Sequence, residues 1–131
     1  MVNDLWRGVQ ANENYLVALG LFSYSEILGR NILNKLDVHD DGLPYFKEFT
    51  IKYVGYKDED LKKLFDSARN GLSHRYFMKH QEGTVYNDQG NLPCGYEISA
   101  TSIKIYIHTY FKHFVLGLEK YLDEKSFDLT G

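Results

Sequence analysis

The sequence predicts an all-α protein, an antiparallel bundle of four to five helices with a small β-hairpin near residues 84–98. Three observations support this prediction. Apolar residues recur at helical spacing over long stretches of the chain. The connections between these stretches are short, which favours antiparallel neighbours, and turn-forming residues concentrate in one late segment. A length of 131 residues fits one domain, so we treat residues 1–131 as a single helical domain.

The first helix is predicted from Asn14 to about Lys35. Apolar residues occur nearly all round the helical wheel between Tyr15 and Phe22, which is typical of a helix that is covered on more than one side. We therefore expect this helix at the centre of the bundle or in a subunit interface.

A loop is predicted over residues 37–44, where Asp, Gly and Pro favour turns. Its His39-Asp40-Asp41 run contains side chains that can bind a metal, but the neighbourhood supplies no further ligand set. We interpret this run as a solvated turn rather than as a metal site.

Two helices are predicted after this loop. Residues 45–53 favour a short helix, with a strand as the alternative because aromatic and β-branched residues are dense. A clearer helix begins near Asp58, a candidate N-cap in an acidic first turn that complements the helix dipole. Its apolar stripe continues to Tyr76, with Gly71 as a kink or a joint between two helices. The stripe consists of Leu61, Leu64, Phe65, Ala68 and Leu72.

Residues 84–86 and 96–98 are predicted to pair as the hairpin, around a turn rich in Asn, Asp and Gly. The last helix is then expected to begin after a cap at Ser99 or Thr101, and its apolar stripe runs as far as residue 122. His108 and His113 flank this stripe, and we interpret both as structural or solvated.

Composition excludes several classes of function. The formal net charge of −3 argues against strong non-specific binding of nucleic acid, although it leaves room for a local basic cleft. Cys94 is the single cysteine, so no internal disulfide can form, and its turn beside Pro93 gives no sign of a nucleophile. The sequence contains no membrane-spanning run, secretion signal, glycine-rich phosphate loop or paired cysteine ligands. We expect a cytoplasmic protein that does not bind a membrane.

The stretch of residues 69–76 contains the strongest chemical signal. Arg69 is a permanent cation with a planar fork suited to phosphate, and His74 can exchange a proton near neutral pH. His74 could act as general acid or base in RNA cleavage while Arg69 stabilises the transition state, with no metal or cofactor. The spacing alone is weak, because Arg75 and His80 repeat it.

On a straight helix, positions 69 and 74 lie about 140° apart, since each residue turns by about 100°. Arg69 and His74 would therefore share a face only if Arg69 reaches round or Gly71 breaks the helix. The structural alternatives are a solvated Arg69, a His74 that bonds a carbonyl group, and a Tyr76 that packs in the core.

The pattern Arg69-Asn70-x-x-x-His74 in a small helical protein resembles the HEPN domain, and Tyr76 extends the match to the Arg-x4-His-x-Tyr form of HEPN toxins. The resemblance implies a toxin or defence endoribonuclease whose site combines Arg and His from both subunits of a homodimer. It also implies that a nucleotidyltransferase antitoxin modifies Tyr76. Asn70, Ser73 and Tyr76 are the candidate supporting residues.

Two alternatives remain open at this point. One is a non-catalytic HEPN-like module that binds a nucleotide or a partner protein, and the other is a plain dimerisation domain without a ligand. The endoribonuclease prediction implies three partners, which are an RNA substrate, a second copy of the chain and the antitoxin.

Overall fold

The computed structural model describes residues 14–38, 40–67, 84–100 and 102–130 of the chain. Within these ranges the protein is mainly helical and also contains a small mixed sheet, so the expected all-α class is right only in part. The helical elements are α2 (Asn14–Ile32), α3 (Leu43–Phe49), the π-helical η1 (Thr50–Val54), α4 (Asp58–Ser67) and α6 (Ile107–Thr130). The strands are β1 (Thr84–Tyr86), β2 (Tyr96–Ile98) and β3 (Ile103–Tyr106).

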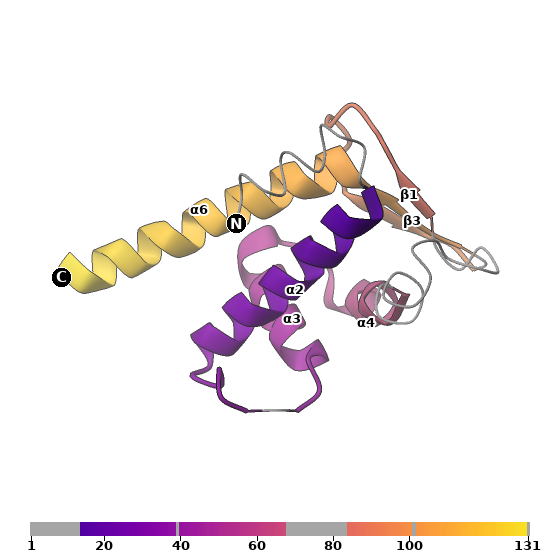
Figure 1. Ribbon diagram of the computed structural model, residues 1–131. Coiled ribbons are helices and arrows are strands. Elements are labelled where there is room, and N and C mark those ends of the chain that lie inside the picture. Colours follow the sequence, from indigo (N-terminus) through magenta and orange to yellow (C-terminus); the bar gives the residue numbers. More distant parts are fainter. Residues whose placement is uncertain (1–13, 39, 68–83, 101, 131) are drawn as a thin grey trace.

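The helices pack around α2, which lies against α3 and also contacts α6 (Figure 1). Gly29 permits the close approach of α2 and α3, because a Cβ atom at this position would lie 1.7 Å from the carbonyl oxygen of Tyr45. Helix α4 packs on α3, and the far end of the long α6 projects beyond the other helices (Figure 1). Within the described part of the chain, no helix combines the length and the apolar character needed to span a membrane.

The sheet corrects the predicted hairpin. Strand β3 lies in the middle, with β1 parallel to it on one side and β2 antiparallel on the other. The segments 84–86 and 96–98 therefore do not pair with each other, and residues 103–106 form a strand instead of the first turn of the last helix. A segment as short as residues 103–106 contains too few apolar positions, Ile103 and Ile105 among them, to distinguish the period of a strand from that of a helix.

Helix α6 begins at Ile107 because Asp88 caps it from the loop between β1 and β2. The Asp88 carboxylate accepts the backbone N–H of His108 at 2.7 Å and the hydroxyl of Thr109 at 2.6 Å. The predicted cap at Ser99 is wrong, since Ser99 bonds Ser102 within the turn between β2 and β3. Thr101, the other predicted cap, lies outside the described residues.

The loop between α2 and α3 is held by a buried arginine. Arg30 donates to the carbonyl oxygen of Val38 at 2.7 Å and to the Asp40 carboxylate at 2.9 Å, and its guanidinium lies over the ring of Tyr45. The Tyr45 hydroxyl also donates to Asp40, and these hydrogen bonds, first from Tyr45 and then from Arg30, lower the pKa of Asp40. Asp40 is therefore part of this network, not simply a solvated turn residue. His39 lies outside the described residues.

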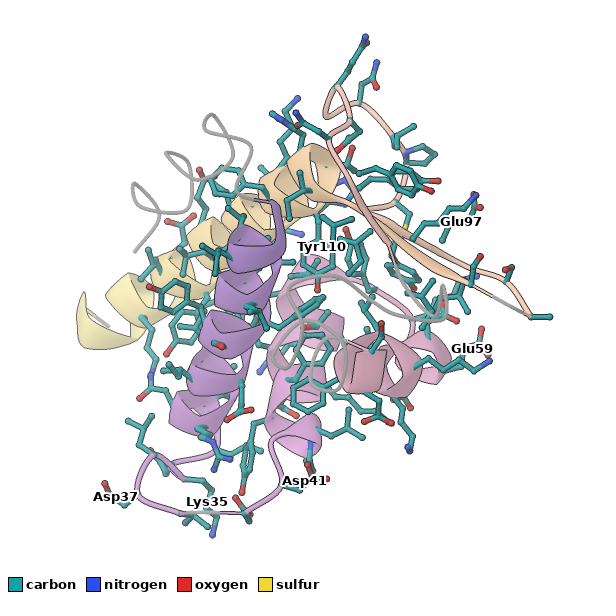
Figure 2. The ribbon with its side chains drawn as sticks, turned by 45° about the vertical axis from the view of Figure 1, so that its right-hand side comes forward. Lys35, Asp37, Asp41, Glu59, Glu97 and Tyr110 are labelled. Atoms are coloured by element: carbon teal, nitrogen blue, oxygen red, sulfur yellow. The ribbon has the colours of Figure 1, made fainter. Side chains whose placement is uncertain are left out.

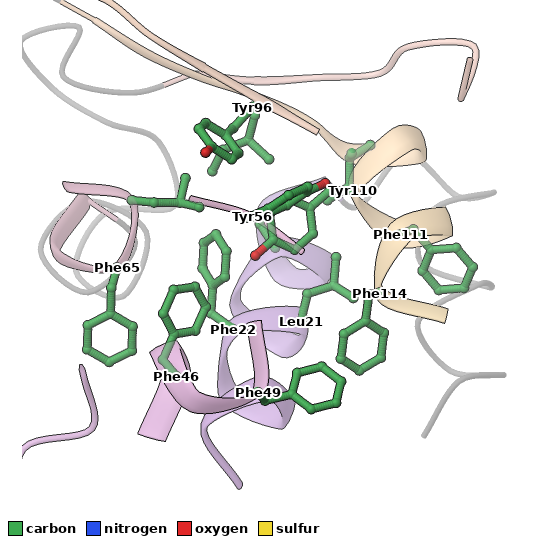
Figure 3. Packing of buried hydrophobic residues seen from close by; sticks show 14 of the residues in the cluster. Leu21, Phe22, Phe46, Phe49, Tyr56, Phe65, Tyr96, Tyr110, Phe111 and Phe114 are labelled. Atoms are coloured by element: carbon green, nitrogen blue, oxygen red, sulfur yellow. The ribbon is translucent and has the colours of Figure 1, made fainter. Parts of the chain in front are cut away.

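The core is built largely from aromatic rings (Figure 3). Phe22 of α2 meets the edges of Phe46 and Tyr110 at centroid distances of 5.4 Å in both cases. Phe49 and Phe114, which are fully buried, join the end of α3 to α6 at a centroid distance of 5.7 Å. Part of the high aromatic content of the sequence therefore lies inside the fold.

Candidate functional site

None of the predicted site residues can be positioned. Arg69, Asn70, Ser73, His74 and Tyr76 all fall within residues 68–83, outside the described part of the chain. The elements on both sides of that segment are described, so the structure defines where the segment begins and where it ends.

Helix α4 leads into the segment. The helix was predicted from its apolar stripe, and its buried residues confirm this stripe as far as the helix is described. Phe65 packs against Phe46 of α3 at a centroid distance of 5.1 Å, and Lys47 pairs with Asp58 at the start of α4. Ser67, the last residue of α4, is buried. The segment therefore starts from a helix end that is packed on the core.

Strand β1 follows the segment. It occupies one edge of the sheet, pairs in parallel with β3 and contacts α2. The side chain of Val85 is buried in the core. The described elements on both sides of residues 68–83 are thus anchored, α4 on the core and β1 on the sheet.

A pocket of about 520 Å³ lies elsewhere in the described structure, and we call it the Tyr56 pocket. Its walls come from the end of η1, the first turn of α4, the loop before β2, β2 itself and α6. The residues that line it are Val54, Gly55, Tyr56, Lys57, Asp60, Pro93, Cys94, Tyr96, Glu97, Ile98 and His113.

A hydrogen-bonded pair forms one wall of the pocket. The hydroxyl of Tyr56 lies 2.6 Å from Nδ1 of His113 and accepts the backbone N–H of Gly95 at 3.0 Å. Gly95 is required here, because a Cβ atom would lie 2.6 Å from both the Tyr56 hydroxyl and the Cα of Tyr110. Burial raises the pKa of Tyr56 well above its usual value, so this phenol keeps its proton.

The neighbouring wall contains a second tyrosine and the cysteine. Tyr96 donates its hydroxyl proton to Asp60 at 2.6 Å, and its ring meets the edge of Tyr56 at a centroid distance of 5.0 Å (Figure 3). Burial raises the pKa of the half-buried Cys94, which makes its thiol a poor nucleophile. This agrees with the interpretation of Cys94 as a residue without a catalytic role.

Sequence reasoning missed this pocket. His113 was interpreted as structural or solvated, and its bond to Tyr56 is structural, but its ring also lines the pocket. Tyr56, Asp60 and Tyr96 come from three separate elements, so no local spacing connects them. One weak sign is present in the sequence, a glycine at position 95 directly before a short strand, which is compatible with close backbone packing.

A metal centre does not emerge from the described residues. No three His, Cys, Asp or Glu side chains converge there in a way that could hold a metal ion. Comparison with known proteins adds no assignment, since no family model, curated protein or solved structure matches this chain.

Proposed function

We propose that the protein is a metal-independent endoribonuclease, in the manner of a HEPN toxin or defence nuclease. The observation that carries this proposal is the Arg69-Asn70-x-x-x-His74-x-Tyr76 stretch in a mainly helical chain. Support comes from its position directly after α4, a packed amphipathic helix that could hold the stretch at the surface.

The reaction requires a base, an acid and a counter-charge. The 2′-oxygen of a ribose attacks the adjacent phosphorus, the bond to the 5′-oxygen breaks, and a 2′,3′-cyclic phosphate remains. His74 takes the proton from the 2′-hydroxyl or gives a proton to the leaving 5′-oxygen. Arg69 binds the phosphate oxygens, where negative charge develops in the transition state.

A homodimer would supply both proton-transfer groups. One copy of the stretch offers a single Arg69–His74 pair, and a two-fold interface would bring a second pair to the same cleft. The exposed side chains of Leu16 and Ile27 on α2, at 53% and 49% exposure, support a further contact surface on this helix. Two copies of Arg69 in one cleft would also double the local positive charge there, so that a chain with a net charge of −3 could still attract an RNA substrate to the cleft.

The decisive experiment is an RNA cleavage assay in excess chelator. The purified protein is incubated with mixed RNA, and the new ends are analysed for 2′,3′-cyclic phosphate. We expect cleavage that is independent of added metal and leaves these cyclic ends. The absence of cleavage in every buffer, or a strict requirement for metal, would contradict the proposal and favour a non-catalytic binding module.

A further inference from the structure

The Tyr56 pocket offers hydrogen-bond donors on one part of its wall. The Tyr56 hydroxyl already accepts from Gly95 and retains its proton, so it donates this proton to Nδ1 of His113. The neutral imidazole must then carry its own proton on Nε2. Burial lowers the pKa of His113, with a smaller effect from Lys112, which favours this neutral form. His113 thus has an N–H group to offer to an oxygen of a ligand, and Lys57 adds a cation to the same lining.

The pocket also contains carboxylates. Asp60 is half-buried and is oriented by the hydroxyl of Tyr96. Glu97 lies on β2 at the outer side of the molecule (Figure 2). Its contact with Lys104 is 3.7 Å long and joins an exposed Glu97 side chain to a partly exposed Lys104, and a pair of this kind is weak. Glu97 can therefore turn to a ligand at little cost.

The remaining wall is apolar. Val54, Pro93 and Ile98 come from three different elements and line the pocket together with the tyrosine rings. A volume of about 520 Å³ lies within the range of about 300–1,000 Å³ that is common for small-molecule sites. The pocket therefore combines hydrogen-bond donors, negatively charged acceptors and an apolar surface in a space suited to one small molecule.

We propose that the Tyr56 pocket binds a zwitterionic ligand of the amino-acid class. Its carboxylate meets Lys57 and His113, its ammonium group meets Asp60 and Glu97, and its side chain packs on Val54, Pro93 and Ile98. A ligand with one charge would pair with only one of the two kinds of charged group in the lining, either the cation or the carboxylates. The inference does not use the Arg69–His74 stretch, because it is argued only from lining residues within the described part of the chain.

The ligand class can be tested with matched compounds. Thermal unfolding of the full chain is followed with each free amino acid at one concentration, and the affinity of the best binder is measured by calorimetry. Its N-acetyl derivative lacks the ammonium group and its primary amide lacks the carboxylate. We expect the free amino acid to raise the Tm and each blocked form to bind at least about tenfold more weakly.

Substitutions then locate the site. Lys57→Met and Glu97→Gln alter exposed residues, so the fold should be retained, and each should weaken binding by about tenfold, the effect of about 1.4 kcal/mol. Lys62→Met is the control, because Lys62 pairs with Asp66 on α4 and does not line the pocket. Unchanged affinity in both pocket variants would overturn the assignment.

Three results would overturn the ligand class itself. One is that no amino acid raises the Tm or binds in calorimetry. Another is that the blocked derivatives bind as tightly as the parent compound. The third is that a nucleoside, which has neither charge, stabilises the protein while amino acids do not.

Discussion

The chain contains two Arg-His pairs with the same spacing, and the residues around each pair favour one of them for the proposed chemistry. Arg69 and His74 are five positions apart, and so are Arg75 and His80. The first pair follows a packed amphipathic helix and is followed by a Tyr two positions after the His, whereas the second pair has neither feature. The Arg75–His80 pair can therefore serve as a control for substitutions in the Arg69–His74 pair.

Arg69→Ala and His74→Ala should each abolish RNA cleavage while the protein stays folded. Loss of a general acid or base costs about 10²–10⁴-fold in rate, and loss of a charge-stabilising donor costs about 10²–10³-fold. Arg75→Ala and His80→Ala should retain most of the activity. Cleavage rates on one labelled RNA, with circular dichroism as the fold control, compare all four variants. If Arg75→Ala and His80→Ala abolished cleavage while Arg69→Ala and His74→Ala retained it, the assignment of the chemistry to Arg69 and His74 would be wrong.

Tyr76→Phe addresses regulation rather than catalysis. We expect this variant to fold and to keep much of its activity, because the ring is retained and the hydroxyl is not the proposed acid. It should escape nucleotidyl transfer when it is produced together with the antitoxin, as measured by the mass of the intact protein. An unfolded Tyr76→Phe variant would instead identify Tyr76 as a core residue.

Two tyrosines in the core should respond in opposite ways to the same substitution. The buried hydroxyl of Tyr110 has no hydrogen-bond partner among the described residues, whereas that of Tyr56 bonds both His113 and Gly95. Tyr56→Phe leaves two groups unpaired and should lower the free energy of unfolding by about 1–3 kcal/mol. Tyr110→Phe should be neutral or stabilising. Urea unfolding at pH 7 tests both, and an equal loss in the two variants would contradict the assigned bonds.

Whole elements show where local sequence pattern succeeds and where it fails. Helix α2, predicted from Asn14 to about Lys35, is observed from Asn14 to Ile32, and the predicted start of α4 at Asp58 is confirmed, because the apolar spacing of both is long enough to define a period. The predicted continuation of the α4 stripe to Tyr76 lies outside the described residues. Strand β3 was assigned to the last helix, because its four residues fit both periods and its two partners lie at other places in the chain. The Asp88 cap was missed for a similar reason, since it acts on a helix that starts 19 positions later.

Local sequence pattern has the same limit for the two candidate sites, the Arg69–His74 stretch and the Tyr56 pocket. The Arg69–His74 stretch could be found because its residues are neighbours in sequence, although their arrangement is not described. The Tyr56 pocket could not be found, because the positions of Tyr56, Tyr96 and His113 depend on how η1, the sheet and α6 pack together. Tertiary packing, not local pattern, creates it.

The start of α6 should depend on the charge of Asp88. Burial alone would raise the pKa of this carboxyl, but hydrogen bonds from Thr109 and from the backbone of Gly90 and His108 outweigh burial and lower it. Asp88→Asn should lower the free energy of unfolding at pH 7 by about 0.5–2 kcal/mol, as for other helix caps. Urea unfolding measures this loss, with Asp123→Asn, an exposed position of α6, as the control.

The pH dependence has a definite sign. Because the folded pKa of Asp88 lies below the unfolded value of about 3.9, its contribution to stability is fully present well above that value. The contribution is lost as the pH falls through the unfolded and then the folded pKa. The difference in unfolding free energy between wild type and Asp88→Asn should therefore shrink as the pH is lowered from about 6 to about 3. A constant difference would show that charge is not the cause.

At the scale of the whole molecule, the proposed site should be shared between two chains. Arg69→Ala and His74→Ala proteins should each be inactive, folded and dimeric. When they are mixed under conditions that allow subunit exchange, some dimers would contain one intact Arg69 and one intact His74 in the same cleft, so part of the activity should return. Light scattering and the RNA assay test this together. A monomer that cleaves RNA would refute the shared site.

The central position of β3 has a consequence for protein synthesis. Strands β1 and β2 have no bonds to each other, so neither can join a sheet until residues 103–106 have been made and have left the ribosome. Because β1 also follows residues 68–83, the nascent chain lacks this paired strand until residues 103–106 are available. The strand that follows the Arg69–His74 stretch is therefore fixed in the sheet only after residues 103–106 have been synthesised, well after the stretch itself.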